Sequence, residues 1–305
     1  MSVQSHPIVV GTDFSEAAET ALDYAALLAA RSQVELQVVY AWNPTGLPLD
    51  AISDDHLLSS LLDQARERVR EKLNELTEGI RSRGIQATAV FEQGPASRIL
   101  PAVAERGRAS LIVVGRHGHA SLAHVFLGSV SERVVRTAPC PVLVVPKIQG
   151  ELRLPRRLLV GVDFSDASRE ALYGAMRIAR QLGCEDGLVL VHAYQDEREM
   201  WLASWSEIGL KAKIAPDDGA LRRWATQELG KGIRFECAVV DGYAERALPR
   251  AMAQKECDWI VLGIQGRTAL ASHLIGSTTQ RILKLSNRPV LAVPPQGAPM
   301  QKGVD

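Results

Sequence analysis

The sequence lacks the features that mark disulfide-rich and strongly charged proteins. Its four cysteines (Cys140, Cys184, Cys237 and Cys257) are scattered and form no CxxC pair. They are therefore predicted to be reduced, structural thiols. Basic and acidic residues number 35 each, so the formal net charge is zero. A neutral chain gives no electrostatic reason to expect nucleic acid or an anionic membrane as a partner.

Long apolar runs and catalytic signatures are also missing. No run approaches the length of a membrane span, and no long apolar stretch follows the polar residues 1–7. We therefore expect neither a transmembrane helix nor a signal peptide, and we expect a cytoplasmic location. The motif GxxxxGK[ST] is absent, and no Ser/His/Asp or Cys/His set has a recognisable nucleophile context. Phosphate-loop ATPase chemistry is not indicated, and no residue is assigned a catalytic role.

What the sequence has is an internal repeat. Residues 7–15, PIVVGTDFS, align with residues 157–165, RLLVGVDFS. A chain of 305 residues with 46% hydrophobic residues is long enough for two full cores. The repeat predicts two duplicated domains, residues 1–147 and 156–305, joined by a polar, proline-containing segment.

Each half alternates short apolar strands with helical patterns. After the aligned first strands, strands are predicted at 34–40, up to 94, 111–114 and 141–146, and at 187–192, up to 242, 259–262 and 289–294. Helices are predicted at 17–31, 55–83 and 96–106, at 167–182, 217–230 and 244–256, and after each glycine motif. This order predicts an α/β fold with two tandem doubly wound domains, each a parallel sheet flanked by helices. Ser15 and Ser165 are predicted N-caps of the first helix in each half.

One glycine pattern, G-x2-G-x9-G-S, lies between a strand and a helix in each half. Its residues are Gly115, Gly118, Gly128 and Ser129, and then Gly263, Gly266, Gly276 and Ser277. Glycines permit positive φ and leave backbone N–H groups open to phosphate oxygens, which helix N-termini also attract. Loop punctuation is the alternative for any single glycine, but the twin spacing favours phosphate binding.

The serines of the pattern have two possible roles. Ser129-x-x-Glu132 and Ser277-x-x-Gln280 match the capping box. A serine at this position can also offer its hydroxyl and its N–H to a phosphate, and the two roles are compatible.

Together these residues resemble the universal stress protein family in its tandem form, over residues 7–146 and 157–294. The resemblance implies five-stranded parallel sheets of order 3-2-1-4-5. In that order a crevice opens at the carboxyl ends of the first and fourth strands. It also implies ATP as the ligand, with or without Mg²⁺.

The resemblance assigns nucleotide contacts in both halves. In the first half they are Asp13, Ala41, Gly94, Gly115, Arg116, His117, Gly118, Gly128, Ser129 and Val130. In the second half they are Asp163, Ala193, Gly242, Gly263, Gly266, Gly276, Ser277 and Thr278. The aspartates would contact the nucleoside or a metal-bound water, with a helix-entry cap as the alternative. The two alanines would meet adenine through their backbone, and Gly94 and Gly242 would lie beside the ribose.

The two glycine loops differ in charge. The first carries Arg116, His117, His119 and His124, and the second carries Ile264, Gln265, Arg267 and His273. A metal site at His117-x-His119 is not favoured, because no acidic or cysteine ligand is near in sequence. If the imidazoles meet phosphate, the first site should bind ATP more tightly as pH falls.

Three functions are compatible with these features. The first is an ATP-binding stress-response regulator, whose nucleotide occupancy changes its conformation or its affinity for a protein partner not identified by the sequence. The alternatives are a nucleotide-independent scaffold and a slow ATPase or autophosphorylating protein. The apolar last strands of the two halves are expected to pair with each other or with a second chain, as a pseudo-dimer or homodimer. Residues 199–210 carry an apolar stripe that either packs on its own domain or docks a partner.

Overall fold

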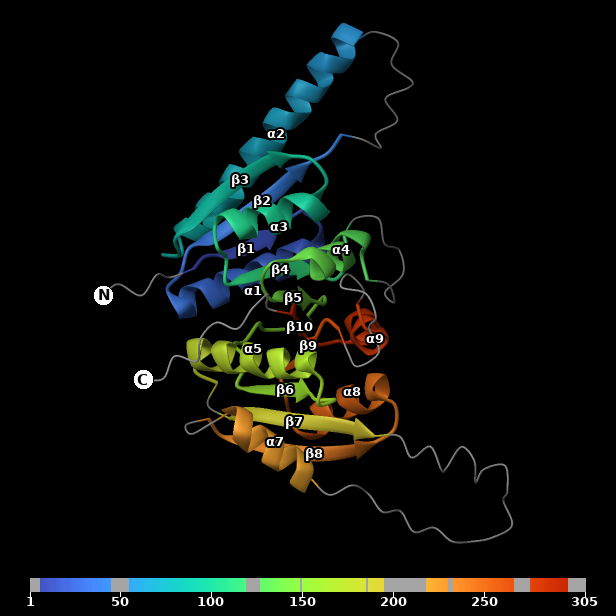
Figure 1. Cartoon of the computed structure of the whole chain (residues 1–305). Helices are drawn as coiled ribbons and strands as arrows, with labels where there is room; N and C mark the ends of the chain where they lie inside the picture. The colour runs from blue at the N-terminus through green and yellow to red at the C-terminus, as the bar shows by residue number, and fades with distance from the viewer. Residues whose placement is uncertain are drawn as a thin grey trace, which may run out of the picture. The chain divides into compact units, whose positions relative to one another are not determined.

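The computed structural model describes residues 6–44, 55–118, 127–148, 150–184, 186–194, 218–229, 233–265 and 275–295. The chain divides into two compact units, Met1–Arg153 and Leu154–Asp305. Figure 1 colours the first unit from blue to green and the second from yellow-green to red. The predicted insert at 199–210 and the residues Gly266, Arg267, His119, His124 and His273 lie outside the described ranges.

The first unit is a parallel sheet with helices on its connections. Its elements are β1 (Ile8–Gly11), α1 (Glu16–Ser32), β2 (Leu36–Trp42), α2 (Asp55–Arg81), β3 (Ala87–Gln93), α3 (Ala96–Arg106), β4 (Leu111–Gly115), α4 (Ser129–Thr137) and β5 (Val142–Val145). The strand order is β3-β2-β1-β4-β5. Val10 of β1 lies opposite Val38 on one side and Val113 on the other.

The second unit repeats this plan. Its elements are β6 (Arg157–Gly161), α5 (Asp166–Leu182), β7 (Gly187–Tyr194), α7 (Gly219–Leu229), β8 (Phe235–Asp241), α8 (Ala244–Gln254), β9 (Trp259–Gly263), α9 (Ser277–Leu285) and β10 (Val290–Val293). The order β8-β7-β6-β9-β10 is the same 3-2-1-4-5 arrangement. The α/β fold with two tandem doubly wound domains is therefore confirmed.

The strands are apolar because helices cover both faces of each sheet. A Cβ built on Gly11 points at Leu100 of α3, whereas one built on Gly115, on the opposite face, points at Ala17 of α1. Val9, Val10, Ile112 and Val113 have no exposed surface. The first strand of each sheet is thus central and buried. Its carboxyl end lies where the chain turns toward the next helix.

Helix starts follow the predicted caps at α1 and α5. The Ser15 hydroxyl accepts a hydrogen bond from the N–H of Ala18, and the Ser165 hydroxyl accepts one from the N–H of Ser168. An N-cap of this kind stabilises a helix by about 1 kcal/mol. Both helices therefore begin at a fixed point just past the β1 and β6 strands.

Two of the cysteines have the properties predicted for structural thiols. Burial raises the pKa of Cys140 to about 12, and burial also raises the pKa of Cys257 to about 12. Such thiols carry almost no thiolate at neutral pH, as expected of structural cysteines.

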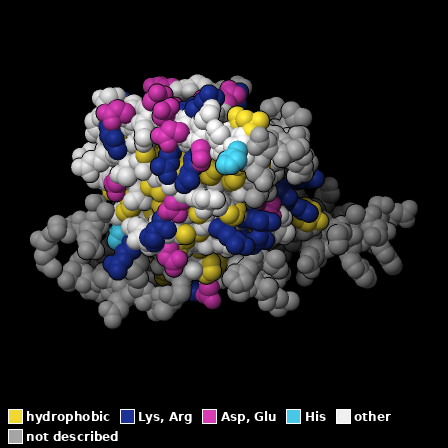
Figure 2. Space-filling model, turned by 90° about the horizontal axis from the view of Figure 1, so that it is seen from above, with side chains coloured by type: hydrophobic (Ala, Val, Ile, Leu, Met, Phe, Trp, Pro, Cys, Tyr) yellow, Lys and Arg dark blue, Asp and Glu magenta, His cyan; other side chains and the backbone are white. Residues whose placement is uncertain are grey.

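Basic and acidic side chains are interspersed on the face drawn in Figure 2. Within the described ranges, no helix combines the length and the apolar character that a membrane crossing needs.

Candidate functional site

The Asp-Phe-Ser turns sit at the carboxyl ends of β1 and β6, and both adopt the same shape. The N–H of Ser15 donates to Oδ1 of Asp13 at 2.9 Å, and the N–H of Ser165 donates to Oδ1 of Asp163 at 3.0 Å. Each aspartate thus closes a local turn through one carboxylate oxygen. The helix-entry role predicted for Asp13 and Asp163 is therefore present through Oδ1 of each carboxylate.

Each turn also holds a phenylalanine in an unusual backbone conformation. Phe14 has φ of 61° and Phe164 has φ of 62°, in the left-handed region. A residue other than glycine costs about 1–3 kcal/mol there, and such strain concentrates at functional sites. The Phe14 ring stacks on Tyr40 at 5.0 Å between centroids, and the Phe164 ring contacts His192 at 4.9 Å. These ring contacts stabilise a turn that aims the aspartate at the end of the sheet.

The first glycines of the two motifs have a packing role that the sequence does not reveal. An ideal Cβ on Gly115 would lie 2.8 Å from the carbonyl oxygen of Ala17, and one on Gly263 would lie 2.4 Å from that of Ala167. Real Cβ atoms do not approach backbone oxygen so closely, so the first turn of α1 or α5 excludes any side chain. Glycine is needed here even without a ligand.

The described glycines of the two motifs do not use the positive φ that glycine permits. Gly128 and Gly276 have φ of −60° and −58°. Gly115, Gly118 and Gly263 are not among the positive-φ residues either. These glycines serve close approach of neighbouring atoms. The positive φ values belong instead to Gly94 at 137° and Gly242 at 108°, directly after β3 and β8.

The structure brings Gly118 and Asp13 together. A Cβ on Gly118 would lie 2.4 Å from Oδ2 of Asp13. The aspartate oxygen that does not close the turn therefore faces the glycine loop. Asp13 and Gly118 are far apart in sequence but lie close together near the carboxyl ends of β1 and β4.

The predicted capping boxes at α4 and α9 are wrong by one residue. The N-caps are Gly128 and Gly276, with no side-chain cap bond, so Ser129 and Ser277 are the first helical residues. The N–H groups of the first turn precede the first i→i−4 donors, which are Glu132 and Gln280. Such first-turn N–H groups have no acceptor within their own helix and attract anions.

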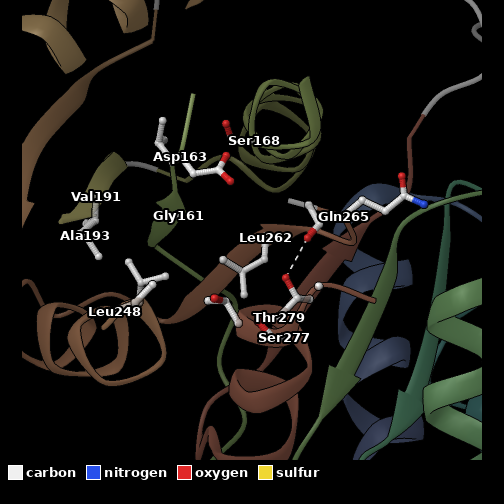
Figure 3. A pocket seen from close by; sticks show the side chains of 15 residues that line it. Gly161, Asp163, Ser168, Val191, Ala193, Leu248, Leu262, Gln265, Ser277 and Thr279 are labelled. Carbon is white, nitrogen blue, oxygen red and sulfur yellow. Dashed lines mark hydrogen bonds between the residues drawn. The ribbon is translucent and has the colours of Figure 1, made fainter. Parts of the chain in front are cut away.

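A cavity of about 230 Å³ opens at this place in the second unit. Figure 3 shows Asp163 and Ser168 on one side, Val191, Ala193 and Leu248 on another, and Ser277 and Thr279 on the α9 side. Of the predicted residues in this unit, the cavity is lined by Asp163, Ala193, Gly263, Gly276, Ser277 and Thr278. Gly242 does not line it. Within the described ranges the lining contains one carboxylate and no Lys, Arg or His side chain.

Several lining residues were missed by sequence reasoning. They are Gly161, Val162, Ser168, Val191, Ala244, Leu248, Leu262, Gln265 and Thr279. Two signals were available for some of them. Val191 and Ala193 alternate along β7, so they share a face. Ala244 and Leu248 are one helical turn apart on α8. Together these four form an apolar wall opposite the polar start of α9.

The backbone of Ala41 and Ala193 faces the open end of the sheet. Val39 accepts from the N–H of Thr12, and Val191 accepts from that of Val162, so these carbonyls point toward β1 and β6. Residues two positions further along a strand point the same way. Because β1 ends at Gly11 and β6 at Gly161, the N–H and C=O of both alanines lie past the end of the neighbouring strand.

Arg116 and His117 contact each other in the first unit. The guanidinium Nε of Arg116 donates to Nε2 of His117 at 2.9 Å. Burial lowers the pKa of Arg116. The prediction of tighter ATP binding at low pH stays a prediction, and His119 and His124 of that loop lie outside the described residues.

Comparisons with known proteins find similarity over nearly the whole chain. The model of the universal stress protein family matches residues 5–146 and again 155–294. A universal stress protein of Mycobacterium tuberculosis is 28% identical over 299 residues, covering 94% of this chain and 97% of that protein. One from Methanocaldococcus jannaschii is 34% identical over 149 residues, covering 47% of this chain and 84% of that protein.

A solved structure shares the fold over nearly the whole length. The crystal structure of a universal stress protein from Archaeoglobus fulgidus covers 96% of this chain and 100% of its own, with a TM-score of 0.69 and 23% identity. The chain belongs to the universal stress protein family, with two tandem domains of that family in one polypeptide.

Proposed function

We propose that this protein binds an adenine nucleotide, ATP in the first place, at the carboxyl end of the sheet in each unit, and that occupancy regulates its response to stress. The observation that carries the proposal is the cavity in the second unit, where Asp163, the Gly263 turn and the first turn of α9 meet. The phosphates would lie on the N–H groups of α9, and adenine on the apolar wall at Ala193. The first unit has the same parts in Asp13, Gly115 and α4.

We propose binding and not turnover as the function. Asp163 is the one titratable side chain among the described residues that line the cavity. General acid–base chemistry needs a positioned group with a suitable pKa, and a single carboxylate that closes its own turn supplies little of that. Slow hydrolysis or autophosphorylation is the alternative function.

The residues present fit Mg²⁺ only as a companion of the nucleotide. Within the described ranges, no three His, Cys, Asp or Glu residues gather into a group able to hold a metal ion. Mg²⁺ is commonly held by one carboxylate, several waters and the substrate phosphates. Asp13 and Asp163 would each provide that carboxylate, so the ion would bind with ATP and not before it.

A nucleotide-independent scaffold is favoured by one specific observation. Gly115 and Gly263 are required by the packing of α1 and α5. Intact glycines at these positions are therefore no evidence of a used pocket, contrary to the argument from the sequence. The case for binding depends instead on the Asp13–Gly118 contact, the cavity and the two helix N-termini.

Thermal unfolding with and without ATP separates the two functions. A ligand present at about 100 times its dissociation constant stabilises the folded state by about 2.7 kcal/mol. We expect ATP to raise the melting temperature clearly, and inorganic triphosphate at equal ionic strength to raise it much less, because it lacks the adenosine. If ATP gives no more stabilisation than triphosphate, the scaffold is the better account.

We also propose that the last strands mediate assembly. β5 and β10 are edge strands of their own sheets, each composed of four apolar residues. Exposed apolar edges invite pairing with another strand. Strand pairing within one chain or between two chains would cover these apolar edges. A cytoplasmic protein partner would then bind to a different surface of the molecule.

A further inference from the structure

Two hydroxyl groups, those of Ser131 and Thr279, tie the end of a strand to the start of the following helix. The Ser131 hydroxyl donates to the carbonyl oxygen of Gly115 at 2.7 Å, and the Thr279 hydroxyl donates to that of Gly263 at 2.9 Å. The second bond is the dashed line in Figure 3. Each hydroxyl reaches back 16 residues along the chain, so each bond closes the base of a glycine loop.

A backbone bond lies beside each hydroxyl. The N–H of Gly128 donates to the carbonyl of Arg116, and the N–H of Gly276 donates to that of Ile264, both at 2.8 Å. The two ends of the loop are thus held by a pair of bonds that does not depend on the residues between them. Ser131 is 5% exposed and Thr279 is 6% exposed, so solvent does not easily replace the hydroxyl.

The role of each hydroxyl depends on the direction in which its glycine carbonyl points. In a trans peptide the C=O points opposite to the N–H of the next residue. The N–H of Ile264 donates to Val293 of β10, and the N–H of Arg116 donates to Val145 of β5. The carbonyls of Gly263 and Gly115 therefore point the other way, toward β6 and β1. That is the side of the crevice where the phosphates would lie.

A carbonyl oxygen aimed at that position would repel phosphate oxygens. The hydroxyl masks this oxygen and at the same time holds the first helical turn, with its N–H groups, beside the crevice. The first unit uses serine and the second threonine, so the shared feature is the hydroxyl and not the methyl group.

We propose that Ser131 and Thr279 are positioning residues for nucleotide phosphates, each by masking a glycine carbonyl and fixing the helix N-terminus against it. This rests on the proposed nucleotide binding and adds a specific claim to it. The hydroxyls should matter for ligands that carry phosphates and not for the nucleoside alone.

Titration calorimetry on the full chain tests this with two double variants. One, Ser131→Ala/Thr279→Val, removes both hydroxyls with little change in volume. The other, Ser131→Thr/Thr279→Ser, exchanges them and keeps both. We expect the first to weaken ATP binding about tenfold, as for a lost buried hydrogen bond. The exchanged pair should stay within about twofold of the parent, and adenosine affinity should be equal in all three proteins.

The outcomes separate the possible failures. Unchanged ATP affinity in the variant without hydroxyls overturns the positioning role, and so does an equal loss for ATP and adenosine, which indicates general damage. A parent that binds no ATP overturns the proposed function together with this inference. If the double variant does not fold, the single isosteric change Thr279→Val is measured, and one of the two ATP sites should weaken about tenfold while the other stays as in the parent.

Discussion

Replacing Ser129 and Ser277 together by aspartate is expected to weaken ATP binding at least about a hundredfold. These residues open α4 and α9, where the phosphates would lie. Two like charges about 4 Å apart repel by about 4 kcal/mol near a protein surface, which corresponds to more than a hundredfold in affinity. The same carboxylates should not harm the fold. A negative charge in the first turn of a helix is favourable by about 0.3–1 kcal/mol.

Opposite effects on binding and stability make this substitution informative. Calorimetry with ATP and chemical unfolding without it would be measured on the same protein. The matched control is Ser129→Asn/Ser277→Asn, which has nearly the same shape and no charge, and which should retain most of the affinity. An aspartate pair that binds ATP like the parent would show that the phosphates lie elsewhere.

The second large effect concerns stability. Gly263→Ala should lower the free energy of unfolding by about 3 kcal/mol, the upper part of the usual range for overpacking. The new Cβ would lie 2.4 Å from the carbonyl oxygen of Ala167 and 2.7 Å from its carbonyl carbon. Both atoms belong to the backbone at the start of α5, so relief requires moving the helix. The loss should appear in the absence of nucleotide.

Gly79→Ala is the natural control for that experiment. Gly79 lies in α2 with nothing within 4 Å of an ideal Cβ. Alanine there should raise the free energy of unfolding by about 0.5 kcal/mol, the lower end of what glycine costs in a helix, because Gly79 lies in the last turn of α2. Chemical unfolding of the two variants should therefore shift in opposite directions. Equal stability of Gly263→Ala and the parent would mean that α5 does not pack as described.

Much of the fold could be predicted because the sequence states it twice. The alignment of the Asp-Phe-Ser turns and of the two glycine motifs indicated the tandem α/β plan, which the strand orders confirm. Strand and helix bounds were close, as at 96–106, because apolar strands and helical spacing are local signals. The N-caps Ser15 and Ser165 were found for the same reason.

What could not be predicted depends on contacts between distant segments. Ser129-x-x-Glu132 matches a capping box, but the Gly128 N–H already bonds to Arg116, and the helix begins one residue earlier than the pattern indicates. In the sequence, Gly115 looks like part of a phosphate-binding pattern. The structure shows that it also packs against the backbone of Ala17.

The sequence contains one weak sign that Ser131 and Thr279 have a shared role. Both stand three residues after the last glycine of the motif, at equivalent positions in the two halves. Their acceptors are 16 residues away, and a sequence pattern does not show which carbonyl a hydroxyl will meet. The contact between Arg116 and His117 is likewise a matter of side-chain direction.

The most direct measurement is a crystal structure of the full chain with saturating ATP. We expect phosphate oxygens about 3 Å from the N–H groups that open α4 and α9, and adenine against the backbone of Ala41 and Ala193. Nucleotide bound at another place, or both crevices empty at saturation, would contradict nucleotide binding at the carboxyl ends of these sheets.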